Sequence, residues 1–109
     1  MFDLETYQDE YAILQKQKFP FDETRPYRKL IGAGEELGEV GHEFLRYERH
    51  LHFNMRKEAD ESKLKMSMEI GDTINFLVAF CNIIGIDISE AVTSAFNKVS
   101  NREDAQNKP

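Results

Sequence analysis

The feature that most constrains the fold is an apolar repeat of seven residues in the middle of the chain. Its members are large side chains at Leu30, Leu37, Phe44 and Leu51. This spacing places them on one face of an α-helix. No segment alternates apolar and polar residues with the period of two that a half-buried strand shows. The sequence therefore predicts an all-α protein.

Breaker and capping residues divide the chain into four predicted helices. The first, over 3–18, carries the apolar stripe Leu4, Tyr7, Tyr11 and Leu14 and stops at Phe19-Pro20, because proline disfavours a helical residue before it. The second begins near Pro26, a residue suited to a first turn, and runs through Leu51.

The polar segment 54–62 predicts a turn, with helix allowed through part of it, and the third helix covers 63–84. Gly85 then stands in the C-cap position, and Asp87 with Glu90 forms an N-terminal capping box. The fourth helix is predicted to reach Arg102. Its expected buried stripe is Ile88, Val92, Ala95, Phe96 and Val99. This pattern predicts a fold of the four-helix-bundle type.

Length and charge bound the architecture and the class of partner. With 109 residues the chain suits one domain, 1–109, with a core of about 3–102 and a fraying tail over 103–109. Acidic residues outnumber basic ones 20 to 14, which argues against nucleic-acid binding. The longest uncharged run, 73–86, is too short to cross a bilayer. A single cysteine and no visible targeting signal favour a cytoplasmic protein without a membrane anchor.

Acidic pairs are the main chemical signal in the sequence. Glu36 and Glu39 are three residues apart on the second helix, with Glu35 beside them, and Glu69 and Asp72 repeat the spacing on the third. If the two pairs face each other in a partly buried cleft, each close contact between like charges costs on the order of 4 kcal/mol at an effective dielectric of 20. A hard divalent cation reverses that sign, and carboxylate oxygens suit Mg²⁺, with Mn²⁺ as an alternative. A solvated acidic face is the competing interpretation.

Glycines give a second signal for close helix packing. Gly34, Gly38 and Gly41 form a stripe within the second helix, and Gly71 stands between the members of the second acidic pair. Each helical glycine costs roughly 1 kcal/mol relative to alanine. We therefore expect the helix backbones to approach each other at these positions, as carboxylates converging on one cation would require.

Glu35-Glu36-x-x-Glu39 and Glu69-x-x-Asp72 together resemble the EExxE…ExxD signature of the MazG-like all-α nucleoside triphosphate pyrophosphohydrolases. The resemblance covers about 27–102. It implies hydrolysis of nucleoside or deoxynucleoside triphosphates between the α- and β-phosphates, giving a monophosphate and pyrophosphate. Such activity serves to clear unwanted nucleotides. It also implies a homodimer or homotetramer in which two chains complete each bundle.

The resemblance also assigns residues. The implied Mg²⁺ ligands are Glu36, Glu39, Glu69 and Asp72. We expect Glu35 or Glu36 to accept the proton of the attacking water. Four further residues are candidate substrate contacts: Asn75, Lys98, Asn101 and Arg102. The family often stacks the base on tryptophan, and this chain has none.

Two other functions remain open from the sequence. A phosphoribosyl-ATP pyrophosphohydrolase shares the same bundle. A non-catalytic helical oligomer that binds metal or nucleotide belongs to a different class. A di-iron carboxylate bundle is less favoured, because Asp72 rather than histidine stands three residues after Glu69.

Overall fold

The computed structural model describes residues 3–102 and consists of helices joined by short turns. The elements are α1 (Leu4–Lys18), the 3-10 turn η1 (Asp22–Thr24), α2 (Tyr27–His52), α3 (Arg56–Ile84) and α4 (Ile88–Ser100). Within residues 3–102 there is no strand. The all-α prediction is confirmed.

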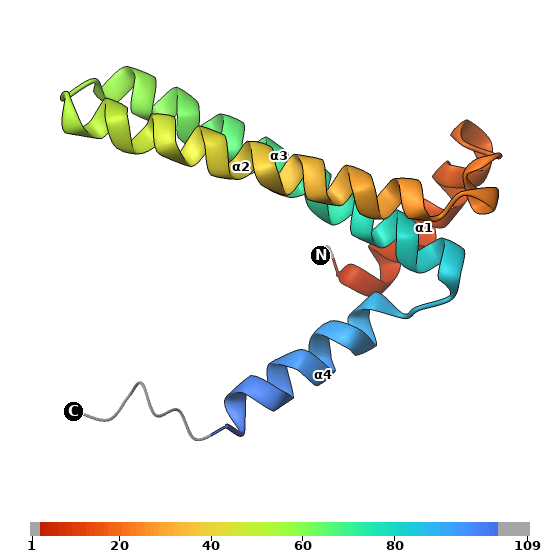
Figure 1. Cartoon of the computed structure of the whole chain (residues 1–109). Helices are drawn as coiled ribbons and strands as arrows, with labels where there is room; N and C mark the ends of the chain where they lie inside the picture. The colour runs from red at the N-terminus through yellow and green to blue at the C-terminus, as the bar shows by residue number, and fades with distance from the viewer. Residues whose placement is uncertain (1–2, 103–109) are drawn as a thin grey trace.

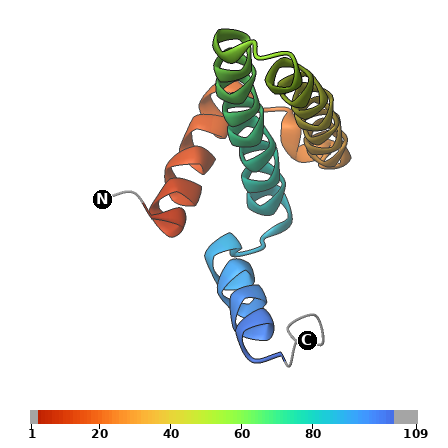
Figure 2. The same cartoon turned by 90° about the vertical axis from the view of Figure 1, so that its left-hand side faces the viewer.

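The architecture is a long helical hairpin with two shorter helices at one end. In Figures 1 and 2, α2 and α3 run side by side in opposite directions, while α1 lies near the C-terminal end of α3. Helix α4 packs chiefly on α1 and points away from the hairpin. One chain therefore supplies the helices of a bundle without closing it.

The helix boundaries agree with the sequence at most ends. Asp3 caps α1, because its side chain accepts a hydrogen bond from Thr6 N at 2.8 Å. Asp87 does the same for α4 through Glu90 N at 3.1 Å. Gly85 ends α3 at φ +86°, a backbone conformation that favours glycine. Helix α4 ends at Ser100, two residues before the predicted end. The expected fraying over 103–109 lies outside the described residues.

The turn between α2 and α3 is shorter than predicted. Helix α3 begins at Arg56 rather than Lys63, so most of the segment 54–62 is helical. The chain reverses over three residues, with Asn54 at φ +57°, and Asn tolerates this region better than most residues. Residues 56–61 include Arg, Lys, Glu and Ala, whose helix propensity outweighs the polarity of the segment.

The hydrophobic core is small. Its buried apolar residues are Ala33, Ala59, Val78 and Ala79. Most of the stripe expected to be buried on α4 is exposed instead: Phe96 is 69% exposed and Val99 62%, because no other helix within residues 3–102 covers that side of α4. The chain exposes 8665 Å², whereas a compact monomer of 12.7 kDa exposes about 6,200 Å².

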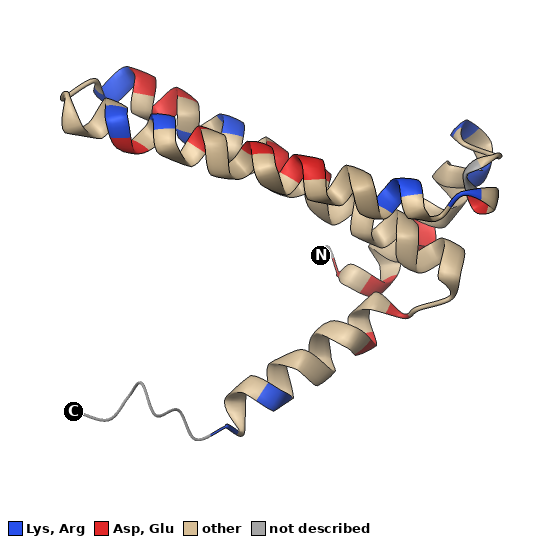
Figure 3. Cartoon of the chain, viewed as in Figure 1, with Lys and Arg blue, Asp and Glu red and all other residues tan. Residues whose placement is uncertain are grey.

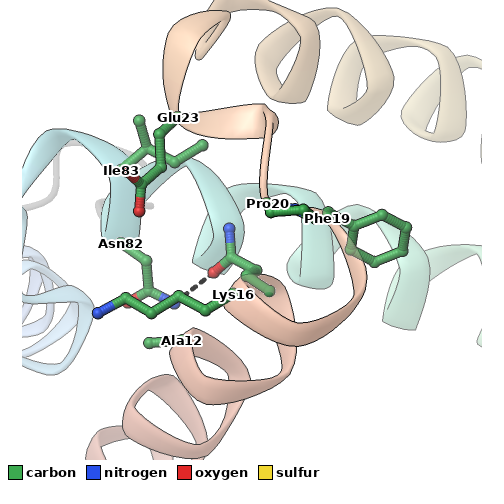
Figure 4. Close-up of a pocket in the computed structure, with 8 residues that line it drawn as sticks. Ala12, Lys16, Phe19, Pro20, Glu23, Asn82 and Ile83 are labelled. Carbon is green, nitrogen blue, oxygen red and sulfur yellow. Dashed lines mark hydrogen bonds between the residues drawn. The ribbon is translucent and has the colours of Figure 1, made fainter.

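Buried amide side chains, rather than the predicted apolar stripe, fasten α1 to α3. Gln15 Nε2 donates to Ala79 O at 3.2 Å, and Asn82 Nδ2 donates to Gln15 Oε1 at 2.7 Å. This pair lies at a cavity of about 120 Å³ between the two helices (Figure 4). Gln8 reaches the α3–α4 connection, because its amide donates to Ile86 O and accepts from Ile88 N. Gln8 therefore ties the start of α4 to α1.

The predicted role of the glycine stripe is wrong within one chain. A Cβ added at Gly34, Gly38, Gly41 or Gly71 would meet no atom within 4 Å. The close approach occurs at Gly32, where an added Cβ would lie 2.5 Å from the ring of Phe76 on α3. The glycine that permits helix packing is thus one turn before Glu36, and the other four face open space.

Glu43 connects the middle of α2 to α3 through polar contacts. Its Oε2 lies 3.0 Å from Arg46 Nη1 and 3.8 Å from Lys65 Nζ. The Ser62 side chain also hydrogen-bonds to it, and this bond, followed by the two cations, holds the pKa of Glu43 below its usual range. Although Glu43 is buried, it is paired, which is the condition under which a buried charge is tolerated.

Within the described residues, α3 also has the length and mean hydropathy of a membrane-spanning helix. Core helices of water-soluble proteins meet the same criterion, so this is weak support for a span. The absence of a membrane anchor, which the sequence predicts, therefore stays a prediction.

We predict that Gly32→Ala destabilises the protein by about 1–3 kcal/mol, because the new methyl group collides with the Phe76 ring. In a Phe76→Leu background the same change should cost less, since the clashing ring atoms are gone. Thermal unfolding of the four variants in this double-mutant cycle measures the coupling. An equal cost in both backgrounds would contradict the contact.

We predict that Glu43→Gln lowers stability at pH 7 by about 1 kcal/mol. A pKa lowered by folding stabilises the native state above the unfolded pKa, about 4.3, and this contribution is lost as pH falls through the folded pKa. The gap between wild type and variant should therefore close below about pH 4. Melting temperatures measured from pH 3 to 8 test this, and a gap that is constant with pH would refute it.

Candidate functional site

The hairpin brings the two predicted acidic pairs together. Glu36 and Glu39 lie on α2, and Glu69 and Asp72 lie on α3; we call these four residues the acidic cluster. Figure 3 shows the acidic segments near the middle of the hairpin. The pKa of Glu36 is raised, first by desolvation and then by the charges of Glu39 and Asp72, with a smaller effect from Glu69. A shift with these causes requires that the four carboxylates are neighbours.

Glu69 occupies the most enclosed position in the acidic cluster. Its residue is 9% exposed, and its Oε2 is buried without a hydrogen-bond partner among the described residues. A buried carboxylate oxygen without a partner costs free energy, typically about 1–3 kcal/mol or more. Oxygen atoms in this state are suitable ligands for a hard cation.

A groove of about 380 Å³ adjoins the acidic cluster between α1, α2 and α3. We call it the central groove, and its lining residues are Tyr11, Phe19, Lys29, Glu36, Asp72, Asn75 and Phe76. Its volume lies in the range of small-molecule sites. The groove therefore offers carboxylates, a lysine, an amide and aromatic rings to one ligand.

Helix spacing explains how these side chains share one groove. Lys29 and Glu36 are seven residues apart on α2, and Asp72 and Asn75 are three apart on α3, so each pair lies on one helical face. The Lys29 Nζ is 5.2 Å from the centre of the Phe19 ring and 5.8 Å from that of Phe76. Both distances allow a cation–π attraction.

The predicted site residues fall into three groups. Glu36, Asp72 and Asn75 line the central groove, and Glu39 and Glu69 complete the acidic cluster beside it. The second group is Glu35 alone, which is exposed on α2 and is not among the charges that raise the pKa of Glu36.

The basic and amide residues of the fourth helix form the last group. Lys98, Asn101 and Arg102 are exposed, and α4 carries them away from the hairpin (Figures 1 and 3). The single chain does not bring these residues to the acidic cluster. Their contact with substrate stays a prediction that requires a second chain.

Sequence reasoning did not identify the α1 side of the central groove as part of the site, because Tyr11 belongs to an apolar helical stripe that favours a core role. Phe19 was visible only as a helix breaker. Lys29 was visible as part of a basic group, Arg25, Arg28 and Lys29, at the start of α2. The seven-residue spacing from Lys29 to Glu36 is the signal that places the lysine on the same face as the acidic cluster. No comparable signal links Phe19 to it.

The histidines bear on the choice of metal. His42 follows Glu39 by three residues, so α2 does contain one Glu-x-x-His motif. Di-iron bundles use two such motifs, and α3 has Asp72 at the matching position. The donor set is therefore all oxygen apart from one exposed histidine, which fits Mg²⁺ or Mn²⁺ better than zinc or iron.

The donor chemistry fits a hard divalent cation, while the side-chain positions are not those of a bound state. Among residues 3–102, no group of three His, Cys, Asp or Glu side chains is spaced to hold an ion. The partnerless oxygen of Glu69 and the mutual repulsion at Glu36 are the two observations that favour a cation here. Binding would require the carboxylates to turn toward one another.

The fold and the acidic cluster define an all-α protein with paired carboxylates on neighbouring helices. A family profile for the MazG nucleotide pyrophosphohydrolase domain matches residues 30–106. Because this is more than two thirds of the chain, the protein belongs to the MazG family of nucleotide pyrophosphohydrolases. Neither the curated proteins nor the solved structures contain a significant match.

We predict that Glu36→Gln raises the melting temperature at pH 7–8 in the presence of EDTA, because it removes one of four repelling charges. The pKa shift of Glu36 is opposite in sign to that of Glu43. A carboxyl pKa raised by folding destabilises the native state as pH increases from the unfolded pKa through the folded one. The difference between wild type and variant should therefore disappear toward pH 4.

Glu48→Gln is the matched control for this measurement, because it removes the same charge from an exposed position on the same helix. It should change the melting temperature little across this range. A lower melting temperature for the Glu36 variant at pH 7 would show that the acidic cluster is not under electrostatic repulsion.

Proposed function

We propose that the protein is an Mg²⁺-dependent pyrophosphohydrolase that cleaves nucleoside or deoxynucleoside triphosphates between the α- and β-phosphates. The products would be a nucleoside monophosphate and pyrophosphate, and the activity would serve to remove unwanted nucleotides from the cytoplasm. The observation that carries the proposal is the acidic cluster beside a ligand-sized groove, in a chain of this family.

The four carboxylates of the acidic cluster would hold the metal. A bound Mg²⁺ would supply charge neutralisation for the triphosphate and polarisation of a phosphoryl oxygen. Glu69, already buried with a partnerless oxygen, suits a fixed ligand. Asp72 and Glu36 reach into the central groove, where the phosphates would lie.

The sequence left two candidates, Glu35 and Glu36, for the residue that accepts the proton of the attacking water. Glu36 interacts with the three other members of the acidic cluster, which favours it as a ligand. Glu35 lies beside them on an exposed part of α2, and its carboxylate is free of that role. We assign Glu35 to accept a proton from the attacking water and Glu36 to the metal.

The substrate would follow the central groove. Lys29 places a positive charge in the same groove as Glu36 and Asp72, where it would attract a phosphate or sugar oxygen. Phe19 and Phe76 flank that lysine and offer aromatic faces in place of the tryptophan that this chain lacks.

A homodimer or homotetramer would complete the bundle. Most large apolar residues of α2 and α4 are exposed in one chain, among them Leu37 at 63%, Leu45 at 61% and Phe96 at 69%. Exposed apolar surface on this scale marks an interaction site. In such an assembly the α4 helix of a second copy would bring its Lys98 and Arg102 to the phosphates, and the open glycine stripe of α2 would permit close contact.

Hydrolysis is tested by incubating the protein with nucleoside and deoxynucleoside triphosphates and Mg²⁺. We expect stoichiometric monophosphate and pyrophosphate. Glu69→Gln should lower kcat/KM by roughly 100-fold, which corresponds to about 2.7 kcal/mol of transition-state stabilisation. Glu48→Gln should leave it unchanged. Release of orthophosphate as the first product would contradict cleavage between the α- and β-phosphates.

Metal binding is tested separately from turnover. Mg²⁺ should raise the melting temperature of the wild type, because a ligand that binds only the native state stabilises it. The rise should be much smaller in Glu69→Gln and unchanged in Glu48→Gln. An equal rise in all three proteins would remove the acidic cluster as the binding site.

The oligomeric state is tested by light scattering on a size-exclusion column. We expect a dimer or tetramer at micromolar concentration. Phe96→Asp should shift it toward the monomer, because a charge would then be buried in the interface. A wild-type monomer would rule out the assembly and the role of Lys98 and Arg102 with it.

A further inference from the structure

The central groove contains one side-chain amide, and a hydrogen bond to its oxygen indicates which end of it a ligand meets. Asn75 is half-buried on α3, and its Oδ1 accepts a hydrogen bond from the hydroxyl of Tyr7 on α1. An amide has one oxygen that accepts and one NH₂ that donates. With the oxygen engaged, the Nδ2 group is left to donate to whatever occupies the groove.

The cation of the central groove agrees with this polarity, and the hydroxyl of Tyr11, which also lines the groove, can donate as well as accept. Lys29 can only donate, and it lines the groove together with Asn75. No hydrogen bond joins Asn75 Nδ2 to another residue in the part of the chain that the structure describes. Away from the carboxylates, the groove therefore presents donors and aromatic faces.

Position along α3 places this donor next to the phosphate end of the central groove. Asp72, a member of the acidic cluster, and Asn75 are three residues apart, about 4.5 Å along the helix axis. Phosphates held at Asp72 would leave the sugar and base to extend past Asn75. The rings of Phe19 and Phe76 there supply flat apolar surface, on which a base can stack.

The groove residues on the α1 side lie outside the family match. The match begins at residue 30, so Tyr7, Phe19 and Lys29 all precede it. The wall of the central groove that orients Asn75 is thus supplied by a segment of this chain outside the matched domain.

We propose that Asn75, oriented by Tyr7, selects nucleotides whose base presents a carbonyl oxygen over those that present an exocyclic amine. Uracil, thymine, guanine and hypoxanthine offer such an oxygen, whereas cytosine and adenine offer an NH₂ donor at the corresponding edge. An amine would face the donor of Asn75 and leave both groups unsatisfied, which is costly in a half-buried site. Tyr7 is a positioning residue in this scheme, because it acts on the ligand through Asn75.

This inference rests on the proposed function for its choice of nucleotides, and the experiment separates the two. Isothermal titration of the wild type with dUMP and dCMP, without triphosphate, measures base selection independently of turnover. These ligands differ along one edge of the base: uracil has a carbonyl oxygen at C4 and a proton on N3, whereas cytosine has an amine at C4 and an unprotonated N3. We expect dUMP to bind roughly 10- to 100-fold more tightly, the range that one mismatched donor pair gives. Hydrolysis of dUTP against dCTP, and of ITP against ATP, should show the same ratio.

Two variants test the residues. Asn75→Asp turns an acceptor toward the ligand, so the dUMP to dCMP ratio should fall below one. In Tyr7→Phe the amide loses its fixed orientation, and the ratio should move toward one. Tyr47→Phe, a matched loss of a tyrosine hydroxyl outside the groove, should keep the wild-type ratio. Helical circular dichroism confirms that each variant is folded.

The outcomes are distinct. Equal wild-type affinities for dUMP and dCMP, or no binding of either, would overturn the inference. An unchanged ratio in both Tyr7→Phe and Asn75→Asp would overturn it as well. Hydrolysis of triphosphates without base preference would sink the inference and leave the proposed function standing. Selective binding of dUMP without any hydrolysis of triphosphates would support the inference and overturn the proposed function.

Discussion

The placing of four carboxylates on two neighbouring helices is the constraint that the rest of the hairpin accommodates. The carboxylates of the acidic cluster lie close enough to raise the pKa of Glu36, and one oxygen of Glu69 is buried without a partner. Something else must hold α2 and α3 together. The hairpin does this with contacts on both sides of the acidic cluster: Gly32 against Phe76 on one side, and Glu43 with its serine and cations on the other. A cation would convert the repelling section between them into an attractive one.

The first helix has two roles that its sequence alone does not suggest. Its amides pair with α3 and with the α3–α4 connection, so polar contacts fix its position where an apolar stripe was expected. That position makes it one wall of the central groove, through Tyr11 and Phe19. A segment outside the matched domain thus supplies groove surface to a site whose carboxylates come from the domain itself.

The incomplete burial of the chain is consistent with these arrangements. A radius of gyration of 17.5 Å exceeds the value of about 13 Å for a compact domain of this length. The excess comes from a long hairpin whose apolar repeat remains exposed and from an α4 helix that leaves it. A chain with four buried apolar residues in its core has little to stabilise it alone. An assembly would add the missing apolar burial and bring α4 of one copy to the hairpin of another.

The local structure and the chemical signal of the acidic pairs could be predicted from the amino-acid sequence alone. The periods of three, four and seven residues predicted helices correctly, Gly85 and Asp87 marked the boundary between α3 and α4, and the spacing within each acidic pair placed its members on one face. These features depend on residues close together in the chain. Which helical faces meet could be seen only once the helices were packed against one another. The tertiary structure paired Gly32 with Phe76 while the glycine stripe stayed open, exposed the apolar face of α4, and brought Tyr7 to Asn75 across 68 positions of sequence. Such contacts depend on how helices cross, and that is set by the whole chain rather than by any one segment.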